Sequence, residues 1–370
     1  MMTVRNRRAW MLPAPSFVAA LTVVACGADP GPAPTAVGVA LDEVFDVTVI
    51  ELEEGPEDSI ATPGIFAERA AGGFLLSDGQ LPRVRSYDEQ GRIEAAFGRF
   101  GEGPFEFRGI SGLAEESSGR VAVVDAGQGR LTYLTGGLRP DTVVRLPGVP
   151  RGVEPLGEDL VLYMPFGDQR EGVSRFFERP MLLQRWTANG SAWSAYRLPY
   201  LPIQRSYWGS IGRFSFAVAG DSIYVGFSLR YPITILNSSG DSIGEIGVPP
   251  ATFQPVPVFE PNAFNPGAYA TQMPELLGGS GTISHIAVVD SHLVVVHGRF
   301  GYPESGGPFG AYQSSLDIYD RYTGRKLYEE VPLPEDSRVL GGGRHLYLLQ
   351  NSSFPPWRVA KLSVRAEKPG

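Results

Sequence analysis

The stretch "FLLSDGQLPRVRSYDEQGR" (residues 74–92) decides the fold, because its pattern returns in "VAVVDAGQGRLTYLTGG" (121–137). Asp78 of the first stretch aligns with Asp125 of the second, which places the two copies 47 residues apart. In both copies an alternating strand ends at the Asp, a glycine-containing turn follows, and a second strand begins at an Arg five residues later. A fixed repeat of this length is typical of propellers and other repeat arrays.

Four further pairs of strands follow this pattern more loosely, and an apolar strand precedes each pair. These pairs lie at residues 160–190, 222–247, 292–331 and 345–365. A unit of four strands, repeated six times, accounts for residues 43–366.

The strand "VFDVTVIELEE" (44–54) belongs to none of these units, and it has Phe45, Val47 and Val49 on one face. The last unit lacks an outer strand, so we expect the N-terminal strand to complete it. Radial closure of this kind leaves only short, protected strand edges. The sequence therefore predicts an all-β fold, a six-bladed β-propeller of four-stranded blades in which the N-terminal strand completes the last blade.

Residues 70–137 resemble the NHL-type repeat, in which a strand ending in Asp, a turn, an Arg-led strand and a Gly-rich connector recur around a propeller. The residues that carry the resemblance are "LSDGQLPRVRSYDEQGR" and the following "FGRFGEGPFEF" (97–107). The chain is also similar to bacterial six-bladed propeller lipoproteins. It departs from the family at Phe105, where the family usually has Gly.

The glycine-rich stretch at 97–107 has two interpretations, a phosphate-binding loop or a connector between blades. A phosphate loop needs its glycines after a buried strand and at the start of a helix, and the residues that follow show no helical period. We therefore expect a connector. Gly101 and Gly103 should allow left-handed or otherwise Cβ-forbidden turns, and Phe105 and Phe107 should pin the crossing between sheets.

The repeated Asp–Arg pairs also allow two interpretations. Asp78 with Arg83, and Asp125 with Arg130, could form a charged binding site. Repetition at equivalent positions of successive blades instead favours a structural role, in which each pair ties its own turn.

The N-terminus carries the signs of export. Three Arg residues precede the apolar run "AWMLPAPSFVAALTVVA", which is short for a membrane span and shaped like a signal peptide. The run ends at "VVACG", which resembles the bacterial lipobox, and Cys26 is the only cysteine of the chain. An ordinary secretory signal with an incidental cysteine is the alternative. We expect a lipoprotein signal peptide at 1–25, a lipidated Cys26 with a flexible tether at 26–42, and the propeller at 43–370.

Charge and the residue after Cys26 bear on location and partners. The net charge of −8 becomes −11 once residues 1–25 are removed, which disfavours binding to nucleic acid. Gly27, rather than Asp, follows the cysteine. By resemblance this favours the outer membrane, so the prediction is a lipid-anchored protein of the cell envelope on its periplasmic or surface face.

The long insertions all fall on the face that carries the second-to-third turns and the blade connectors. They lie at 165–180, 199–212, 249–281 and 298–314. Long loops on a rigid scaffold often carry function, and aromatic and Arg residues are enriched in recognition surfaces. The predicted recognition residues are Arg170, Arg175, Tyr207, Trp208, Phe264, Tyr269, Arg299 and Tyr302. The alternative, compatible with the first, is that the aromatics fold these loops into a lid over the channel.

Four arginines precede or begin inner strands: Arg108, Arg151, Arg213 and Arg338. Because inner strands line the axis of a propeller, these guanidinium groups could ring the channel mouth and bind an anion. Structural, paired arginines are the alternative.

The sequence contains no catalytic motif that we recognise, and no catalytic residue or metal ligand is assigned. It has four histidines. We place His285 and His297 on the loop face and His292 and His345 on the other, which disfavours a three-histidine zinc site but leaves a calcium site open. Two hypotheses follow. The favoured one is a binding or scaffold propeller that recruits a protein, peptide or glycan, and the alternative is a metal-assisted hydrolase or lyase acting on a small anionic substrate at the channel mouth.

Overall fold

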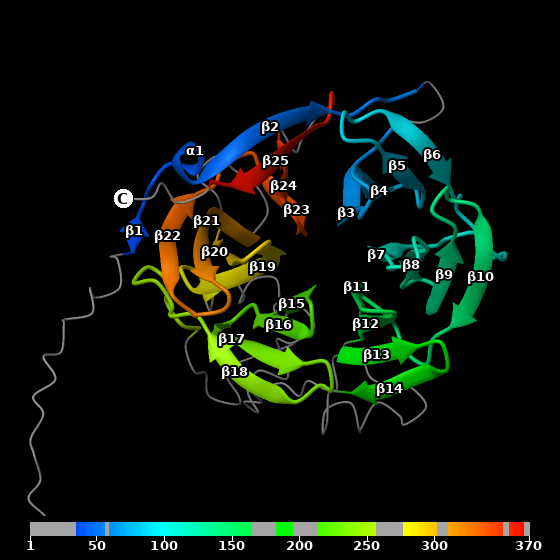
Figure 1. Ribbon diagram of the computed structural model, residues 1–370. Coiled ribbons are helices and arrows are strands. Elements are labelled where there is room, and N and C mark those ends of the chain that lie inside the picture. The colour runs from blue at the N-terminus through cyan, green and yellow to red at the C-terminus, as the bar shows by residue number, and fades with distance from the viewer. Residues whose placement is uncertain are drawn as a thin grey trace, which may run out of the picture. The chain divides into compact units, whose positions relative to one another are not determined.

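The computed structural model describes residues 35–55, 59–164, 183–194, 214–256, 277–301, 310–350 and 355–365. The chain divides into residues 1–34 and a compact unit at 35–370, and only the second is described below. Its strands form six sheets around a central axis, antiparallel except for β1 at the edge of one of them, so the fold is the predicted six-bladed β-propeller (Figure 1). Blades 1 to 6 follow the order of the chain, and each begins with its innermost strand.

The strands of blades 1 to 3 are β3 (Pro63–Glu68), β4 (Phe74–Asp78), β5 (Val84–Tyr87), β6 (Ile93–Phe97), β7 (Ile110–Glu115), β8 (Val121–Asp125), β9 (Arg130–Leu134), β10 (Pro140–Arg145), β11 (Gly152–Leu156), β12 (Asp159–Tyr163), β13 (Leu183–Thr187) and β14 (Gly190–Ser194). Those of blades 4 to 6 are β15 (Phe214–Ala219), β16 (Ser222–Phe227), β17 (Arg230–Asn237), β18 (Ser242–Ile246), β19 (Gly281–Val289), β20 (His292–Gly301), β21 (Gly310–Asp320), β22 (Lys326–Pro332), β23 (Arg338–Gly342), β24 (Leu346–Gln350) and β25 (Arg358–Val364), completed by β2 (Phe45–Glu51).

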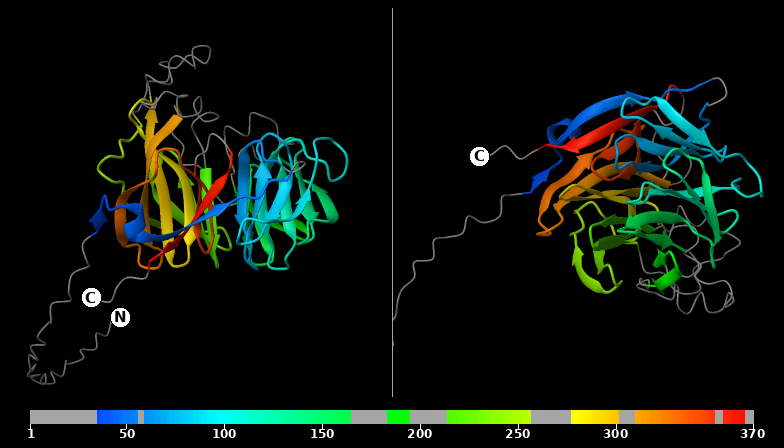
Figure 2. Two further views of the ribbon diagram at one scale, coloured as in Figure 1. Left: turned by 90° about the horizontal axis from the view of Figure 1, so that it is seen from above. Right: turned by 45° about the vertical axis from the view of Figure 1, so that its right-hand side comes forward.

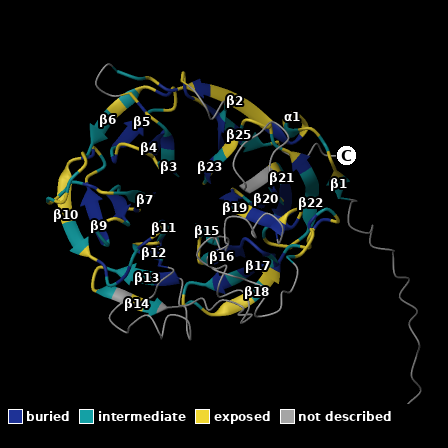
Figure 3. Ribbon diagram, turned by 180° about the vertical axis from the view of Figure 1, so that it is seen from behind, coloured by how far each residue is buried: buried dark blue, intermediate teal, exposed yellow. Residues whose placement is uncertain are grey.

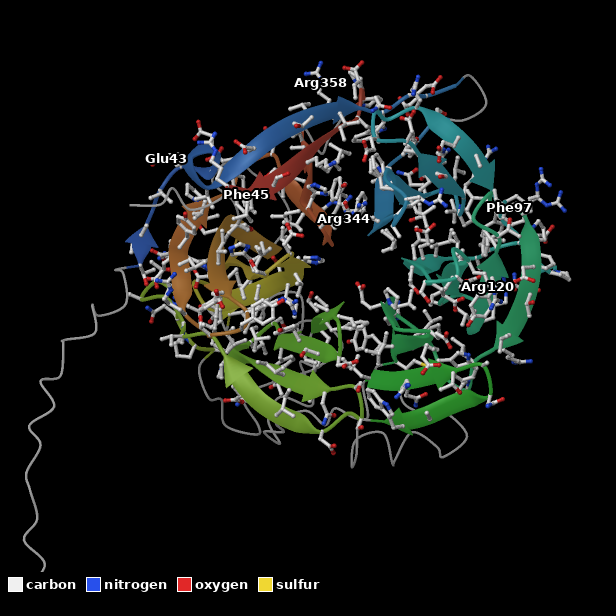
Figure 4. The ribbon with its side chains drawn as sticks, viewed as in Figure 1. Glu43, Phe45, Phe97, Arg120, Arg344 and Arg358 are labelled. Atoms are coloured by element: carbon white, nitrogen blue, oxygen red, sulfur yellow. The ribbon has the colours of Figure 1, made fainter. Side chains whose placement is uncertain are left out.

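The ring closes through β2, as the sequence predicts. This strand pairs antiparallel with β25, from Phe45 opposite Val364 to Glu51 opposite Arg358 (Figure 4 labels Phe45 and Arg358). Phe45 is fully buried, whereas Val47, on the same strand, keeps an exposed fraction of 41% because β2 is the outermost strand of its blade.

Two short elements precede β2, the first within the segment 26–42 that the sequence assigns to the tether and the second across its end. β1 (Ala36–Val37) pairs parallel with β22 at the outer edge of blade 5, and α1 (Leu41–Val44) leads into β2. The Thr35 hydroxyl donates to the carbonyl of Lys326 (3.1 Å), and the Gly38 N–H donates to the carbonyl of Glu329 (2.9 Å). The first described residues are therefore fixed to blade 5.

Apolar side chains fill the seams between blades. The described residues form six apolar clusters, and each cluster joins two successive blades. In the cluster between blades 1 and 2, for example, Leu75 and Val84 meet Leu113 and Val121. The middle strands are accordingly buried and the outermost strands exposed (Figure 3). Burying one such side chain contributes about 1.5–3 kcal/mol, so the seams hold the ring together.

Polar contacts join the seams around blade 1 on the face of the inner-to-second turns. The Glu68 carboxylate accepts hydrogen bonds from His345 Nδ1 (2.7 Å) and the Tyr347 hydroxyl (3.0 Å), which ties blade 1 to blade 6. Arg69 pairs with Glu115 of blade 2 at 2.8 Å. Arg344 of blade 6 (Figure 4) donates to the carbonyl of Arg69 at 2.9 Å.

The glycine-rich stretch between β6 and β7 is a connector, as predicted. The Gly101 N–H donates to the Phe107 carbonyl (3.1 Å), and the Glu106 carboxylate accepts from the Gly103 N–H (2.8 Å). Phe107 is fully buried in the cluster between blades 1 and 2, and Phe105 packs against that cluster. Both aromatic side chains thus pin the crossing.

Left-handed backbone occurs in this connector at Gly98 (φ +105°) and Phe105 (φ +63°). The second value explains why glycine suits this position in the family that the stretch resembles, since a side chain at positive φ is strained. Gly101 and Gly103, where the sequence predicts left-handed or Cβ-forbidden turns, are not left-handed. A Cβ at Gly101 would overlap the Glu106 carboxylate, so that side chain would have to shift.

Replacing Phe45 with Ala tests the closure. We expect a loss of about 3–5 kcal/mol in the free energy of unfolding, because a fully buried ring is removed from the seam between blades 5 and 6. Val49→Ala on the same strand, with 52% of Val49 exposed, should change stability by less than about 0.5 kcal/mol. The measurement is urea unfolding of residues 35–370, and equal midpoints for the two variants would contradict the packing role of β2.

Replacing Gly98 with Ala tests the connector. A Cβ at Gly98 would lie 2.8 Å from the Phe107 ring, at a backbone φ of +105°, so we expect destabilisation by about 1–3 kcal/mol. The control is Gly137→Ala, where nothing lies within 4 Å of the added Cβ, with an expected change below about 0.5 kcal/mol. Thermal unfolding compares the two, and a Gly98→Ala protein as stable as the control would show that the turn adapts freely.

Candidate functional site

The loop face of the propeller is defined here as the face that carries the second-to-third turns and the blade connectors. Every innermost strand begins on it, because each connector leads from an outermost strand to the next innermost one. Arg108 lies two residues before β7, Arg151 directly precedes β11, and Arg338 begins β23, so all three lie next to the starts of innermost strands as expected. Arg213 lies outside the described residues.

The three described arginines make different contacts. Arg108 forms an ion pair with Glu102 of its own connector (3.1 Å). Arg338 donates to the carbonyl of Pro63, which links blade 6 to blade 1. Arg151 is exposed.

Most of the predicted recognition residues lie in segments outside the described residues. These are Arg170, Arg175, Tyr207, Trp208, Phe264, Tyr269 and Tyr302. The remaining one, Arg299, is exposed on β20, where it lies opposite Gly281 of β19 and Tyr312 of β21.

The strands of blade 5 extend beyond the other blades on the loop face. The sequence predicts a long turn at 298–314, but β20 continues to Gly301 and β21 starts at Gly310, so the ends of this segment are strand. The two strands stay paired up to Gly301 opposite Gly310. We call the extension, formed by residues 281–283, 297–301 and 310–315, the blade 5 wall. The left view of Figure 2 shows these yellow and orange strands standing above their neighbours.

The wall is supported from blade 4 and its connector. The Ile283 N–H donates to the carbonyl of Ser228 (2.8 Å), and the Gly281 N–H donates to that of Gln254 (2.6 Å). The buried ring of Phe253 packs so closely on Gly281 that a Cβ there would lie 2.6 Å away. These contacts tie the base of the wall to blade 4 and its connector.

A buried carboxylate, Asp317 of β21, lies at the base of the wall. Its neighbours come from three strands of blade 5 and from β17 of blade 4. Their distances from its oxygens are 3.0 Å for His297 Nε2 and the Glu330 N–H, 3.1 Å for Lys326 Nζ, and 3.3 Å for the Tyr231 and Tyr319 hydroxyls. The carboxylate therefore joins blades 4 and 5.

The surroundings of Asp317 set its charge state. Burial acts to raise the pKa of the carboxyl, but the hydrogen bond and charge of His297, the Glu330 N–H and the Lys326 ammonium outweigh it and hold the pKa below its usual range. Burial raises the pKa of the Tyr231 hydroxyl well above its usual range, and the Asp317 charge acts in the same direction. At neutral pH the centre therefore holds an ionised Asp317 carboxylate next to the neutral Tyr231 hydroxyl.

Strand register shows that this centre replaces the repeated Asp motif in blade 5. His297 of β20 occupies the position that Asp78 has in β4 and Asp125 has in β8. Asp317 of β21 occupies the position that Arg85 has in β5. In blade 1, Asp78 Oδ2 lies 3.9 Å from Arg85 Nη1. The equivalent pair in blade 5 is His297 with Asp317, in which the acid lies on the third strand instead of the second. The sequence analysis missed Asp317, although an acid between apolar neighbours inside a strand is a usable signal of a buried polar contact.

The aspartates of blades 1 and 2 have a structural role, as expected. The Asp78 N–H donates to the Arg83 carbonyl (3.0 Å) across the turn, and Asp125 lies opposite Arg130 in the pairing of β8 with β9. Asp78 accepts hydrogen bonds from the Gln80 N–H of its own turn (2.8 Å) and from the Ala61 N–H of the preceding connector (2.8 Å). Asp125 likewise accepts from the Arg108 N–H (3.0 Å). The Arg130 guanidinium donates to the carbonyl of Gly103 (2.9 Å) and so fixes the glycine-rich connector.

The other histidines do not meet this centre. His285 lies inside β19, where burial lowers its pKa to about 4. His345 contacts Glu68 on the opposite face, and His292 begins β20 next to the inner-to-second turn. Burial also raises the pKa of Glu154, on β11, to about 8. Among the described residues, no group of three or more His, Cys, Asp or Glu side chains could hold a metal ion.

Comparisons with known proteins show the fold. No protein-family model and no curated protein match the sequence. A putative exported protein from Bacteroides fragilis NCTC 9343 matches with a TM-score of 0.60 and 11% identity, over 90% of this chain and 98% of that one. A member of the DUF4221 family from Bacteroides vulgatus ATCC 8482 matches with a TM-score of 0.61 and 11% identity, over 87% and 97% of the two chains. At this identity the likeness establishes the six-bladed propeller alone.

Within the described part of the chain, no helix has the length and apolar character needed to cross a bilayer.

Replacing Asp317 with Asn tests the polar centre. At pH 7 we expect a loss of about 1–3 kcal/mol in the free energy of unfolding, because the substitution removes the buried partner of the Lys326 ammonium, which keeps Glu329 at 2.5 Å. A carboxyl whose folded pKa is depressed contributes stability above its unfolded pKa and loses it as the pH falls through the folded value. The difference in the free energy of unfolding between the wild type and Asp317→Asn should therefore persist down to about pH 4 and become smaller below it.

Urea midpoints measured across this pH range check the prediction. The control is Asp241→Asn, an exposed carboxylate in the turn between β17 and β18, which should change the midpoint little at any pH. A difference in urea midpoint between the wild type and Asp317→Asn that stays constant down to pH 2 would show that the charge of Asp317 contributes nothing to stability.

Proposed function

We propose that this protein is an exported lipoprotein, anchored at Cys26, whose propeller binds a partner through the loop face. The lipobox-like end of the N-terminal apolar run supports the anchor. A structural neighbour described as a putative exported protein supports export. The outer membrane and the relationship to NHL-type repeats remain parts of this proposal, and the partner is a protein, peptide or glycan of the cell envelope.

The observation that carries the proposal is the blade 5 wall. It presents the exposed Arg299 on paired strands, which hold a side chain more firmly than a loop does. A buried polar centre and the connector from blade 4 both support its base. An arginine presented in this way can form bidentate contacts with a carboxylate, phosphate or sulfate of the partner.

The channel-mouth arginines extend the same chemistry. Arg151 is exposed at the start of β11, and we propose that it binds an anionic group of the partner. Arg108 and Arg338 already contact Glu102 and Pro63, so they would join Arg151 only by exchanging these contacts. Arg213 completes the proposed ring.

Affinity capture from envelope extracts tests the proposal, with the anchored full-length protein as bait. We expect Arg299→Ala, and separately replacement of residues 257–276 by a short Gly-Ser linker, to reduce partner recovery severalfold. This deletion leaves in place Phe253 and Leu277, which pack in the seams. The matched control is Arg139→Ala, an exposed arginine in the turn between β9 and β10 on the opposite face.

Recovery of the same partners in the same amounts by all four proteins would refute recognition through the loop face. Unfolding midpoints of each variant, measured alongside, separate loss of binding from loss of fold.

A further inference from the structure

The chain enters the propeller at one point of its rim. β1 is the fifth strand of blade 5, outside β22, and β2 is the outer strand of blade 6. The C-terminal end lies in the same region, because the Arg365 N–H donates to the carbonyl of Val44 (2.9 Å). Figure 1 shows β1, α1 and the start of β2 side by side, on the opposite side of the ring from β10.

The reach of the chain from this point is short. Nine residue steps separate Cys26 from Thr35, the first described residue. Fully extended, this length spans about 30 Å, and as a flexible chain its root-mean-square span is about 17 Å. A compact domain of this size has a radius of gyration of about 20 Å, so the far side of the ring lies beyond the reach of the tether.

The rim at this point exposes apolar side chains. Eight large apolar residues of the described chain are exposed, and three of them, Val37, Val47 and Val49, lie on β1 and β2 next to the tether. The two carboxylates of β2 are paired: Arg365 lies 2.8 Å from Asp46, and Arg358 lies 3.4 Å from Glu51. The adjoining α1 exposes two further carboxylates, Asp42 and Glu43.

We propose that the outer surface of β1 and β2, at the rim of blades 5 and 6, rests on the phospholipid surface to which Cys26 is anchored. The propeller then stands on its rim, and both of its faces open sideways along the membrane. The exposed valines contact the headgroup region, and the arginines paired with Asp46 and Glu51 reduce the repulsion of these two carboxylates by anionic lipids. This inference rests on the proposed lipid anchor, but it does not depend on what the loop face binds.

Site-specific quenching tests the orientation. Because Cys26 is the only cysteine and its thiol is blocked by lipidation, a cysteine introduced at Val47 can be labelled alone with a fluorescent maleimide. The lipidated full chain is reconstituted into phosphatidylcholine–phosphatidylglycerol vesicles containing nitroxide-headgroup lipid. We expect quenching at Val47→Cys to exceed that at Thr142→Cys, an exposed position on β10, by about twofold or more because of the short tether.

A lengthened tether provides the second arm. Inserting about 30 Gly-Ser residues between Ala33 and Pro34 roughly doubles the root-mean-square span, so the excess quenching at Val47→Cys should fall while the protein still sediments with the vesicles. Replacing both Val37 and Val49 with Asp should have the same effect.

The outcomes separate the orientation from the anchor. Equal quenching at the two positions in protein that sediments with vesicles overturns the orientation and leaves the anchor intact. Protein that fails to sediment, and whose Cys26 reacts with maleimide, overturns the anchor and the orientation together.

Discussion

The pairing of β2 with β25 joins the two ends of the described chain, and the position of every blade depends on it. Six blades packed through apolar seams close into a ring only if the last blade has a complete set of strands. β2 supplies its outer strand and also places Phe45 in the seam with blade 5. Without this pairing β25 would present an open edge, which invites pairing with other chains. The same contact fixes both chain ends at one part of the rim.

Seams differ in how they combine apolar and polar contacts. Apolar packing is present in all six, while a buried carboxylate joins blades 4 and 5 and another, Glu68, joins blades 6 and 1. A buried ion pair adds little net stability over apolar packing. Removing one member is destabilising, because the other member then stays buried without its partner. Asp317 has partners on four strands, so its main effect is to specify one arrangement of the seam beneath the wall.

The repeat could be predicted because it follows the twofold period of strands and recurs at a fixed distance, as Asp78 and Asp125 show. Contacts between one repeat and its neighbouring connector could not be predicted from the pattern. For example, the hydrogen bond that Asp125 accepts from the Arg108 N–H depends on how the connector folds back. The extension of blade 5 was missed because "HGRFGY" is rich in glycine and resembles a turn, although its backbone stays paired to Gly301. Most candidate recognition residues lie in long insertions, where no period constrains the chain, so only their face could be predicted from the order of the strands.

The two faces of the ring differ in how much room they leave for insertions. On the face of the inner-to-second turns, short turns are held by contacts such as Arg69 with Glu115, and an insertion there would separate charges that join blades. On the loop face, a segment between two strands can lengthen without entering a seam, provided that its ends stay paired. The wall shows the limit of this freedom, because it extends the blade itself and therefore needs Asp317 at its base. A ring built in this way can change what it binds by changing loops, while the seams that hold it remain the same.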